Sequence, residues 1–174
     1  MNTVPIIVLT GVENAGKTTL AKALSEEWGW SLIPEAARQD ETVRSGRTGQ
    51  QDLQRLLTQF RRRLDEHDAA EDRHLLCDTG ALVLDMWSRE VFGTSLPDVE
   101  ETMKRADLHL LCHTLPEWTP DPLRTLPKFE DRLSLQEKYR SRLAATGIPF
   151  AEIKPAPLSQ RVAQVQRALR TLRP

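Results

Sequence analysis

The sequence predicts an α/β fold in which a parallel sheet of five strands carries helices on both faces. Five short apolar segments alternate with longer segments of helical periodicity, which is the pattern that parallel sheets with crossover helices produce. The first apolar segment runs directly into a glycine-rich loop and then into a helical pattern. The chain has 174 residues, of which 39% are hydrophobic and 28% charged, so it is large enough to bury a core. We expect one domain over residues 1–174.

The predicted strands are the five apolar runs, each of which has the length of a single buried strand. They are Val4–Leu9, Trp30–Ile33, His74–Cys77, Asp107–Cys112 and Ile148–Ile153. In a parallel sheet the carboxyl ends of the strands meet at one edge, where ligands bind in this architecture. Residues that directly follow the strands are therefore the first candidates for a site.

The predicted helices follow from apolar residues that recur at a spacing of three and four. One pattern comprises Leu53, Leu56, Leu57, Phe60 and Leu64, and the last comprises Leu158, Val162, Val165, Leu169 and Leu172. The segment Ala81–Phe92 is apolar on nearly all sides, so we expect it to be well buried, with Trp87 in the core. Ser134 and Glu137 form a capping-box signal for a helix that Gly147 ends.

The glycine-rich loop is the most specific motif of the chain. Residues 11–18 read Gly-Val-Glu-Asn-Ala-Gly-Lys-Thr and fit the phosphate-loop (P-loop) pattern G-x-x-x-x-G-K-[ST]. The glycines let the main chain direct N–H groups at phosphate oxygens, at a helix N-terminus that favours negative charge. Lys17 is expected to reach the β- and γ-phosphates, and the Thr18 hydroxyl to ligate Mg²⁺. The residues expected to bind ATP in this loop are Gly11, Glu13, Asn14, Ala15, Gly16, Lys17, Thr18 and Thr19.

Three classes of P-loop protein are distinguished by the residues at the ends of the other strands and by motifs elsewhere in the chain. A GTPase would carry an Asn/Thr-Lys-x-Asp motif and an Asp-x-x-Gly motif, and neither occurs in the sequence. A mechanical ATPase usually ends its third strand with two adjacent acids, one for Mg²⁺ and one that activates water. Here Asp78 is followed by Thr79, so the metal-binding carboxylate is present and the water-activating one is not. These observations favour a small kinase, which transfers the phosphoryl group to a bound hydroxyl.

A kinase needs an acceptor site beside the γ-phosphate, and the second strand ends in residues suited to one. Glu35 is expected to accept the proton of the acceptor hydroxyl or to orient it, and Arg38 to bind a phosphate or a carboxylate. A carboxylate placed for a helix dipole is the alternative for Glu35. Asp78 is expected to hold Mg²⁺ together with Thr18. Whether Glu35 or Asp78 contacts the acceptor hydroxyl is left open at this point.

The segment Thr114–Arg132 is expected to form a lid, because it follows the fourth strand and emerges at the carboxyl edge of the sheet. It contains four prolines, few aliphatic residues and several basic ones. Arg124 and Arg132 are expected to close over the triphosphate and offset the charge that develops during transfer. The alternative is a proline-rich surface connection whose arginines are solvated.

These motifs together resemble the ribosylnicotinamide kinase domain of NadR-type proteins. The resemblance rests on the P-loop with an acid at Glu13, on residues 34–38 (Pro-Glu-Ala-Ala-Arg), on Cys77-Asp78-Thr79, and on Trp118 with Asp121 and Arg124. It implies an enzyme that uses ATP and Mg²⁺ to phosphorylate the ribose hydroxyl of nicotinamide riboside. By this resemblance, Trp118 would stack on the nicotinamide ring, and Asp121 would lie in the acceptor site.

The sequence departs from that family in the lid and in the P-loop. Glu117 replaces a proline before Trp118, and Pro122 replaces a glycine. Because proline cannot adopt the positive φ that glycine allows, the backbone of the lid must differ there. Asn14 replaces a serine at a position that is expected mainly to contribute its backbone. These changes concern the acceptor more than ATP.

Two other functions stay open: a kinase for another nucleoside, nucleotide or polynucleotide end, and an ATP-binding regulatory protein with little transfer activity. A net charge of −1, and acids around Arg61–Arg63, argue against nucleic acid as a partner. We expect a cytoplasmic protein, because there is no basic leader, no apolar run of membrane-spanning length and no cysteine framework. The sequence does not indicate an oligomeric state.

Overall fold

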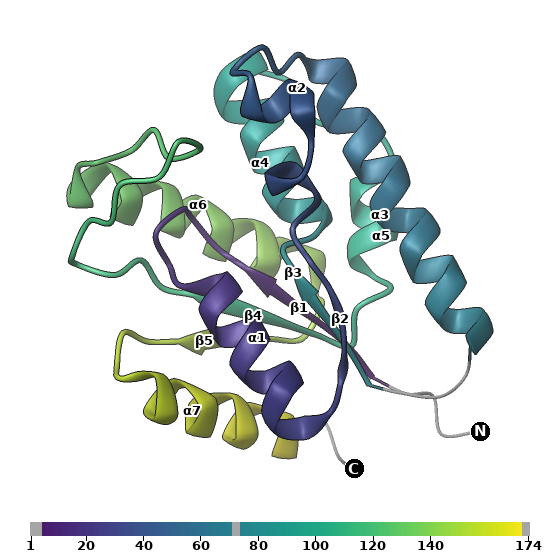
Figure 1. The fold of residues 1–174 in the computed structure, drawn as a ribbon, viewed down its shortest axis with the longest axis vertical. Helices are drawn as coiled ribbons and strands as arrows, with labels where there is room; N and C mark the ends of the chain where they lie inside the picture. The colour runs from purple at the N-terminus through teal and green to yellow at the C-terminus, as the bar shows by residue number, and fades with distance from the viewer. Residues whose placement is uncertain (1–4, 71–73, 172–174) are drawn as a thin grey trace.

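The computed structural model describes residues 5–70 and 74–171, which form one five-stranded parallel sheet between two layers of helices (Figure 1). The strands are β1 (Ile6–Thr10), β2 (Ser31–Ile33), β3 (Leu75–Asp78), β4 (Leu108–Cys112) and β5 (Phe150–Ile153). Their order is β2-β3-β1-β4-β5, and the predicted fold class is confirmed. Each strand lies within two residues of its predicted bounds. Val4 of the first predicted strand and Leu172 of the last predicted helix lie outside the described residues.

The central position of β1 places the P-loop at the switch point of the sheet. β1 pairs with β3 on one side and with β4 on the other, for example Leu9 with Asp78 and Thr10 with Leu111. Because the chain continues to different sides of β1, a crevice opens at its carboxyl end. The loop that follows β1 therefore lies where the ends of β3 and β4 meet it.

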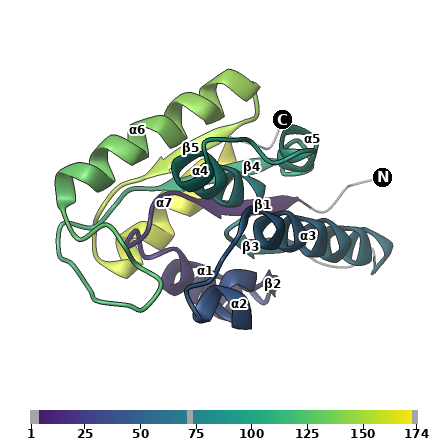
Figure 2. The same ribbon diagram turned by 90° about the horizontal axis from the view of Figure 1, so that it is seen from above.

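Alternate residues of β1 pack against opposite helical layers, as the period of two in a strand requires. Ile7 and Leu9 pack with α1 (Lys17–Trp28) and α7 (Leu158–Arg170) on one face. Ile6 and Val8 face the other layer, which contains α3 (Gln50–Ala70), α4 (Ala81–Phe92) and α6 (Phe129–Thr146), as Figures 1 and 2 show. Within the described residues, no helix is both long and apolar enough to cross a membrane.

The short elements and the start of α6 differ from the prediction. The 3-10 helix η1 (Ala36–Arg38) and the helices α2 (Glu41–Arg44) and α5 (Val99–Met103) were too short to produce a periodic signal. α6 begins at Phe129 rather than Ser134, because the acids Glu130 and Asp131 occupy a favourable place in its first turn. Gly147 ends α6 with φ of 67°, as predicted.

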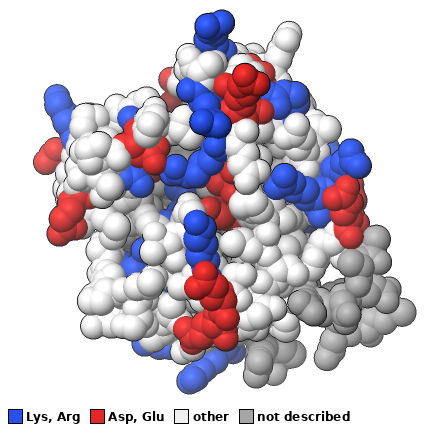
Figure 3. All heavy atoms as spheres, in the orientation of Figure 1, with Lys and Arg blue, Asp and Glu red and all other residues white. Residues whose placement is uncertain are grey.

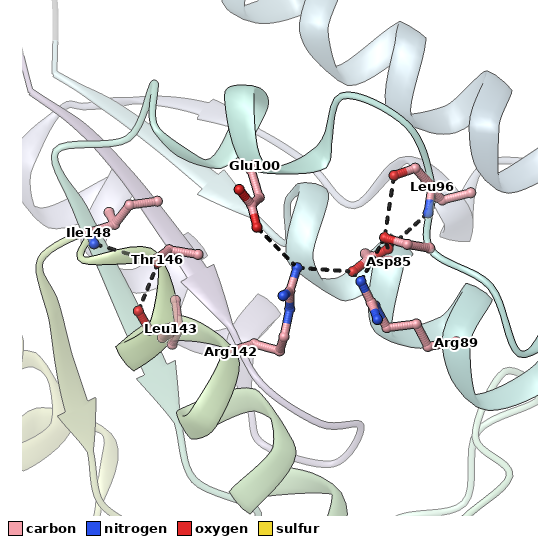
Figure 4. Close-up of polar contacts among 9 residues, drawn as sticks. Asp85, Arg89, Leu96, Glu100, Arg142, Leu143, Thr146 and Ile148 are labelled. Atoms are coloured by element: carbon pink, nitrogen blue, oxygen red, sulfur yellow. Dashed lines mark hydrogen bonds and ion pairs between the residues drawn. The ribbon is translucent and has the colours of Figure 1, made fainter.

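A buried carboxylate on α4 fixes the connection that follows this helix (Figure 4). Asp85 has no exposed surface, and its Oδ1 accepts hydrogen bonds from the Ser95 hydroxyl at 2.6 Å and from the Leu96 N–H at 2.9 Å. Its Oδ2 accepts a hydrogen bond from Arg89 Nε at 2.7 Å. The loop that leads from α4 to α5 is therefore folded around one side chain.

The same carboxylate also connects α4 to α6. Arg142 of α6 lies with its Nη2 3.8 Å from Asp85 Oδ2 and 3.7 Å from Glu100 Oε1 of α5. Asp85 is fully buried, so it is costly to leave without its partners, whereas Arg142 and Glu100 are partly exposed. α4, α5 and α6 are consequently held as one unit on this face of the sheet.

We predict that Asp85→Ala lowers the free energy of unfolding by about 2–4 kcal/mol, because it leaves the Leu96 N–H and nearby arginines without their buried acceptor. Glu90→Ala is the matched control on α4, since Glu90 pairs with Lys138 at the exposed surface. Its cost should stay below about 1 kcal/mol. Urea denaturation followed by circular dichroism measures both, and equal losses would contradict the role of Asp85.

Candidate functional site

The loop between β1 and α1 has the backbone shape that a phosphate-binding loop requires. Gly11 has φ of 130°, and a Cβ atom there would collide with the carbonyl oxygen of Cys112 on β4. Asn14 and Gly16 also have positive φ, at 56° and 64°. α1 begins at Lys17, so the N-terminus of a helix of 12 residues points into the loop. Thr18 is half-buried and Thr19 is exposed in the first turn.

The Lys17 ammonium lies inside the loop. Its Nζ donates to the carbonyl oxygens of Gly11 at 2.9 Å and Val12 at 2.7 Å. Burial lowers the pKa of Lys17, while the negative charges of Glu35 and Asp78 act in the opposite direction. The three predicted residues Lys17, Glu35 and Asp78 are therefore close enough to influence one another, and a polyphosphate would supply the negative charge that the buried ammonium favours.

An arginine of the last helix, α7, stabilises this loop by donating hydrogen bonds to its carbonyl oxygens. Arg161 of α7 is 4% exposed, and its two terminal nitrogens donate to the carbonyl oxygens of Ala15 at 2.7 Å and Gly16 at 3.3 Å. Arg161 was not among the predicted site residues, because it lies far from the motif along the chain. Its one signal was its place on the apolar face of α7, three residues after Leu158.

Two buried oxygen atoms beside the loop have no hydrogen-bond partner within residues 5–70 and 74–171. They are Oδ1 of Asp78, which is 3% exposed, and the hydroxyl of Thr10, which has no exposed surface. Asp78 ends β3 next to β1, and Thr79 after it has φ of 73°, which is uncommon for a residue with a side chain. No cluster of three or more His, Cys, Asp or Glu side chains suited to a metal occurs among residues 5–70 and 74–171.

The predicted acceptor residues Glu35, Arg38 and Asp121 form a chain of ion pairs. Arg38 Nε donates to Glu35 Oε2 at 2.7 Å, and Arg38 Nη1 donates to Asp121 Oδ2 at 2.9 Å. The Arg38 guanidinium holds the pKa of Asp121 below its usual range. This chain connects the end of β2 to the long segment between β4 and α6, so residues distant in sequence meet at one place.

A pocket of about 40 Å³, open to solvent, lies between the ends of β2 and β3 and the helices α3 and α4. Glu35 and Asp78 line it together with apolar side chains. Trp87 also lines it and is half-buried, whereas the sequence analysis placed this residue in the core. The remaining lining side chains include Ile33, Leu56, Phe60, Arg63, Val83 and Leu84.

Trp118 does not lie among the residues that line this pocket. Its ring is instead 5.0 Å from the Arg132 guanidinium carbon and 5.9 Å from that of Arg124. Contacts between a guanidinium and an indole face are favourable, so Trp118 packs within its own segment. The aromatic side chains placed at the pocket are Phe60 and Trp87, not Trp118.

The long segment between β4 and α6 is tied to the P-loop by two side chains of that loop. The Glu13 carboxylate accepts hydrogen bonds from the N–H of Thr125, at 2.9 and 3.0 Å, and from the N–H of Leu126. Asn14 Nδ2 donates to Glu117 O at 2.6 Å, and Asn14 Oδ1 accepts from Arg124 at 3.0 Å. The expectation that Asn14 contributes mainly its backbone misses this role of its side chain.

The two arginines expected to cover the triphosphate have different surroundings. Arg124 is half-buried and bonds to Asn14 and to Thr119 O. Arg132 has no exposed surface, and its donors are used by the Thr114 hydroxyl at 2.8 Å and by carbonyl oxygens of residues 115, 126 and 127. In this conformation Arg132 holds the segment together and does not face a ligand.

Comparison with known proteins places the chain in a family. Residues 6–161 match the model of a family described as an AAA domain. A search of curated proteins finds no match. Among solved structures, a NadR protein in complex with NR is similar over 98% of this chain, with a TM-score of 0.75 and 20% identity. The present chain spans about half of that protein, 52% of its length.

Two further structures match over nearly their whole length. A deoxyadenosine kinase from M. mycoides has a TM-score of 0.67 and 14% identity, over 95% of this chain and 99% of that one. A thymidylate kinase from Ehrlichia chaffeensis has a TM-score of 0.64 and 13% identity, over 95% of this chain and 98% of that one. The fold is therefore that of P-loop nucleoside and nucleotide kinases.

We predict that replacing Glu13 and Asn14 loosens the segment that they hold. In Glu13→Ala/Asn14→Ala, the N–H groups of Thr125 and Leu126 lose their side-chain acceptor, so their hydrogen exchange should accelerate about tenfold or more. Hydrogen–deuterium exchange of peptides that span residues 119–128 measures this. Glu117→Gln is the control, because no hydrogen bond of its side chain occurs among the described residues. Unchanged exchange in the double variant would contradict the tether.

Proposed function

The chain belongs to the AAA-domain family whose model matches residues 6–161, and we propose that it is a kinase that transfers the γ-phosphoryl group of ATP to a hydroxyl of a nucleoside. The observation that carries this proposal is the pocket lined by Glu35 and Asp78, whose charges act on Lys17 of the P-loop. A second substrate in that pocket would have its reacting group beside the terminal phosphate. Positioning of this kind supplies much of the catalysis in phosphoryl transfer.

In the proposed reaction the acceptor hydroxyl oxygen attacks the γ-phosphorus in line. A new oxygen–phosphorus bond forms, the bond to the β,γ-bridging oxygen breaks, and ADP leaves. The hydroxyl proton passes to a carboxylate of the chain. We assign this step to Glu35, because it lines the open pocket and only its Oε2 is engaged by Arg38. Lys17 and the amides of the P-loop offset the charge on the phosphates.

Asp78 is better suited to Mg²⁺ than to the acceptor. Its Oδ1 is buried without a partner, and an oxygen ligand of this kind, with the Thr18 hydroxyl, fits the few protein ligands that Mg²⁺ takes beside phosphates. When bound, the ion would neutralise charge on the β- and γ-oxygens. Asp78 and Thr18 are therefore the proposed metal ligands.

For the acceptor, we propose nicotinamide riboside as the first candidate. The motifs shared with NadR-type kinase domains support it, and the apolar pocket with Phe60 and Trp87 is suited to a flat ring. Another nucleoside is the second candidate, since the deoxyadenosine kinase matches over 99% of its own length. In this proposal the segment 114–132 acts as a lid that contributes Arg124.

We predict that ADP release is stimulated by an acceptor and depends on Lys17 and Glu35. Lys17→Ala should lower turnover about a hundredfold or more, because it removes the cation that contacts the transferred group. Glu35→Gln should lower kcat by about a hundredfold, and leave the Kd for MgATP within about twofold. A coupled ADP assay with a panel of nucleosides and pyridine ribosides measures these effects.

Glu27→Gln, at the exposed end of α1, is the control for Glu35→Gln and should be fully active. ADP release that ignores every acceptor would favour a regulatory ATP-binding protein over a kinase. An unchanged kcat in Glu35→Gln would remove Glu35 from the acceptor site.

We predict that Arg161→Met weakens MgATP binding about tenfold, because the two loop carbonyls lose hydrogen bonds worth about 1 kcal/mol each. Titration calorimetry at constant pH measures the Kd. Arg167→Met, in the exposed part of the same helix, should leave it unchanged. If both variants bind MgATP as the original chain does, Arg161 has no part in shaping the loop.

A further inference from the structure

The acceptor pocket contains a cation that the reaction outlined above does not use. Arg63 of α3 lines the pocket and is half-buried. Within the described residues it has no hydrogen bond and no ion pair. A guanidinium carries five N–H donors in a fixed arrangement, and here they are available to a bound molecule.

The neighbouring arginines of α3 make Arg63 unusual. Arg55 pairs with Asp40 and Asp52 at 2.7 and 3.1 Å. Arg61 and Arg62 pair with Asp98 and Glu66 at 2.8 and 2.9 Å. On the face shown in Figure 3, Lys and Arg likewise alternate with Asp and Glu rather than forming one patch. Arg63 alone of these four helix residues lines the pocket, and it alone has no partner in the described chain.

The position of Arg63 on the helix directs it toward the pocket. Leu56, Phe60 and Arg63 lie on one face of α3, at a spacing of four and three, and all three line the pocket. α3 ends shortly before β3 begins, so it runs opposite to the strands and its N-terminus lies toward their carboxyl ends (Figure 1). Helical side chains lean toward the N-terminus of their helix, which here is the side of the P-loop.

The pocket therefore has negative charges on its strand side and a positive charge on its helix side. Glu35 and Asp78 come from the strand ends and act on Lys17, whereas Arg63 comes from the helix. An acceptor without an anionic group would leave Arg63 without a counterion. An acceptor with a negative group would be attracted to Arg63 and repelled by the two carboxylates, which fixes its orientation.

We propose that the acceptor carries an anionic group, a carboxylate or a phosphate, which Arg63 binds while the reacting hydroxyl lies at Glu35. This inference rests on the proposed kinase activity and narrows the acceptor class of that site: among pyridine ribosides it favours nicotinic acid riboside over nicotinamide riboside, whose ring is positively charged. Guanidinium groups bind carboxylate and phosphate alike through paired N–H donors. The class comprises nucleosides with an acidic ring substituent and nucleosides with a sugar phosphate and a free hydroxyl.

The test compares acceptors that differ only in the charged group. Comparing nicotinic acid riboside with nicotinamide riboside tests for recognition of a carboxylate. Comparing thymidine 3′-phosphate with thymidine tests for recognition of a phosphate. We expect the acidic member of one pair to have a kcat/KM higher by about tenfold or more, and Arg63→Gln to abolish that preference. The kcat/KM for the member without the acidic group should change less than about threefold in this variant.

Arg62→Gln is the matched control, because Arg62 is exposed, pairs with Glu66 and does not line the pocket. It should keep the full preference, and thermal unfolding of both variants checks the fold. The inference is overturned if the original chain prefers neither acid, or if Arg63→Gln keeps the preference.

Measuring acceptor binding as well as turnover distinguishes a failure of this inference from a failure of the proposed activity. The four acceptors are titrated into the original chain and into Arg63→Gln with a non-hydrolysable ATP analogue present. Acid binding that depends on Arg63 without any ADP release would contradict the kinase and support the anion site. Turnover that is equal for acceptors with and without the acidic group would support the kinase and reject the anion site. Neither binding nor turnover would reject both.

Discussion

The close approach of the main chain at Gly11 to β4 is the constraint on which the rest of the site depends. Only a residue without a side chain can pass the Cys112 carbonyl there, and the backbone then turns through Asn14 and Gly16 into α1. This turn brings the helix N-terminus, Lys17 and the ends of β3 and β4 to one place. Arg161 occupies the space behind it, so the loop is supported on the side away from the sheet edge.

The acceptor side is built differently, from side chains of several elements. Glu35 and Asp78 come from strand ends, while Phe60, Arg63 and Trp87 come from two helices. α4, which carries Trp87, contacts α6 through the buried Asp85, whose Oδ2 lies 3.8 Å from Arg142 Nη2. A wall that carries sparse charges selects a ligand by where its polar groups lie.

Local pattern predicted the fold, the P-loop and the strand-end residues Glu35 and Asp78, but not the side chains that the helices contribute to the site. Strands and glycine positions are encoded within a few residues, so the apolar runs and residues 11–18 were sufficient. Arg161, the Asn14 side chain and Trp87 act across the fold, and their surroundings depend on helix packing. Trp87 was assigned to the core because helical periodicity does not distinguish the wall of a pocket from a packed interior. The start of α6 was misplaced because a capping-box signal inside a helix outweighed the charges of the true first turn.

The bonds from Glu13 and Asn14 to the segment between β4 and α6 have a thermodynamic consequence. Both side chains belong to the phosphate-binding turn, yet their partners lie more than 100 positions further along the chain. Movement of the P-loop or of the distant segment strains the same few hydrogen bonds, so a ligand bound to one changes the free energy of the other. Linkage then requires reciprocity: a molecule that stabilises the distant segment changes the affinity for a polyphosphate by the same factor as the polyphosphate changes the affinity for that molecule.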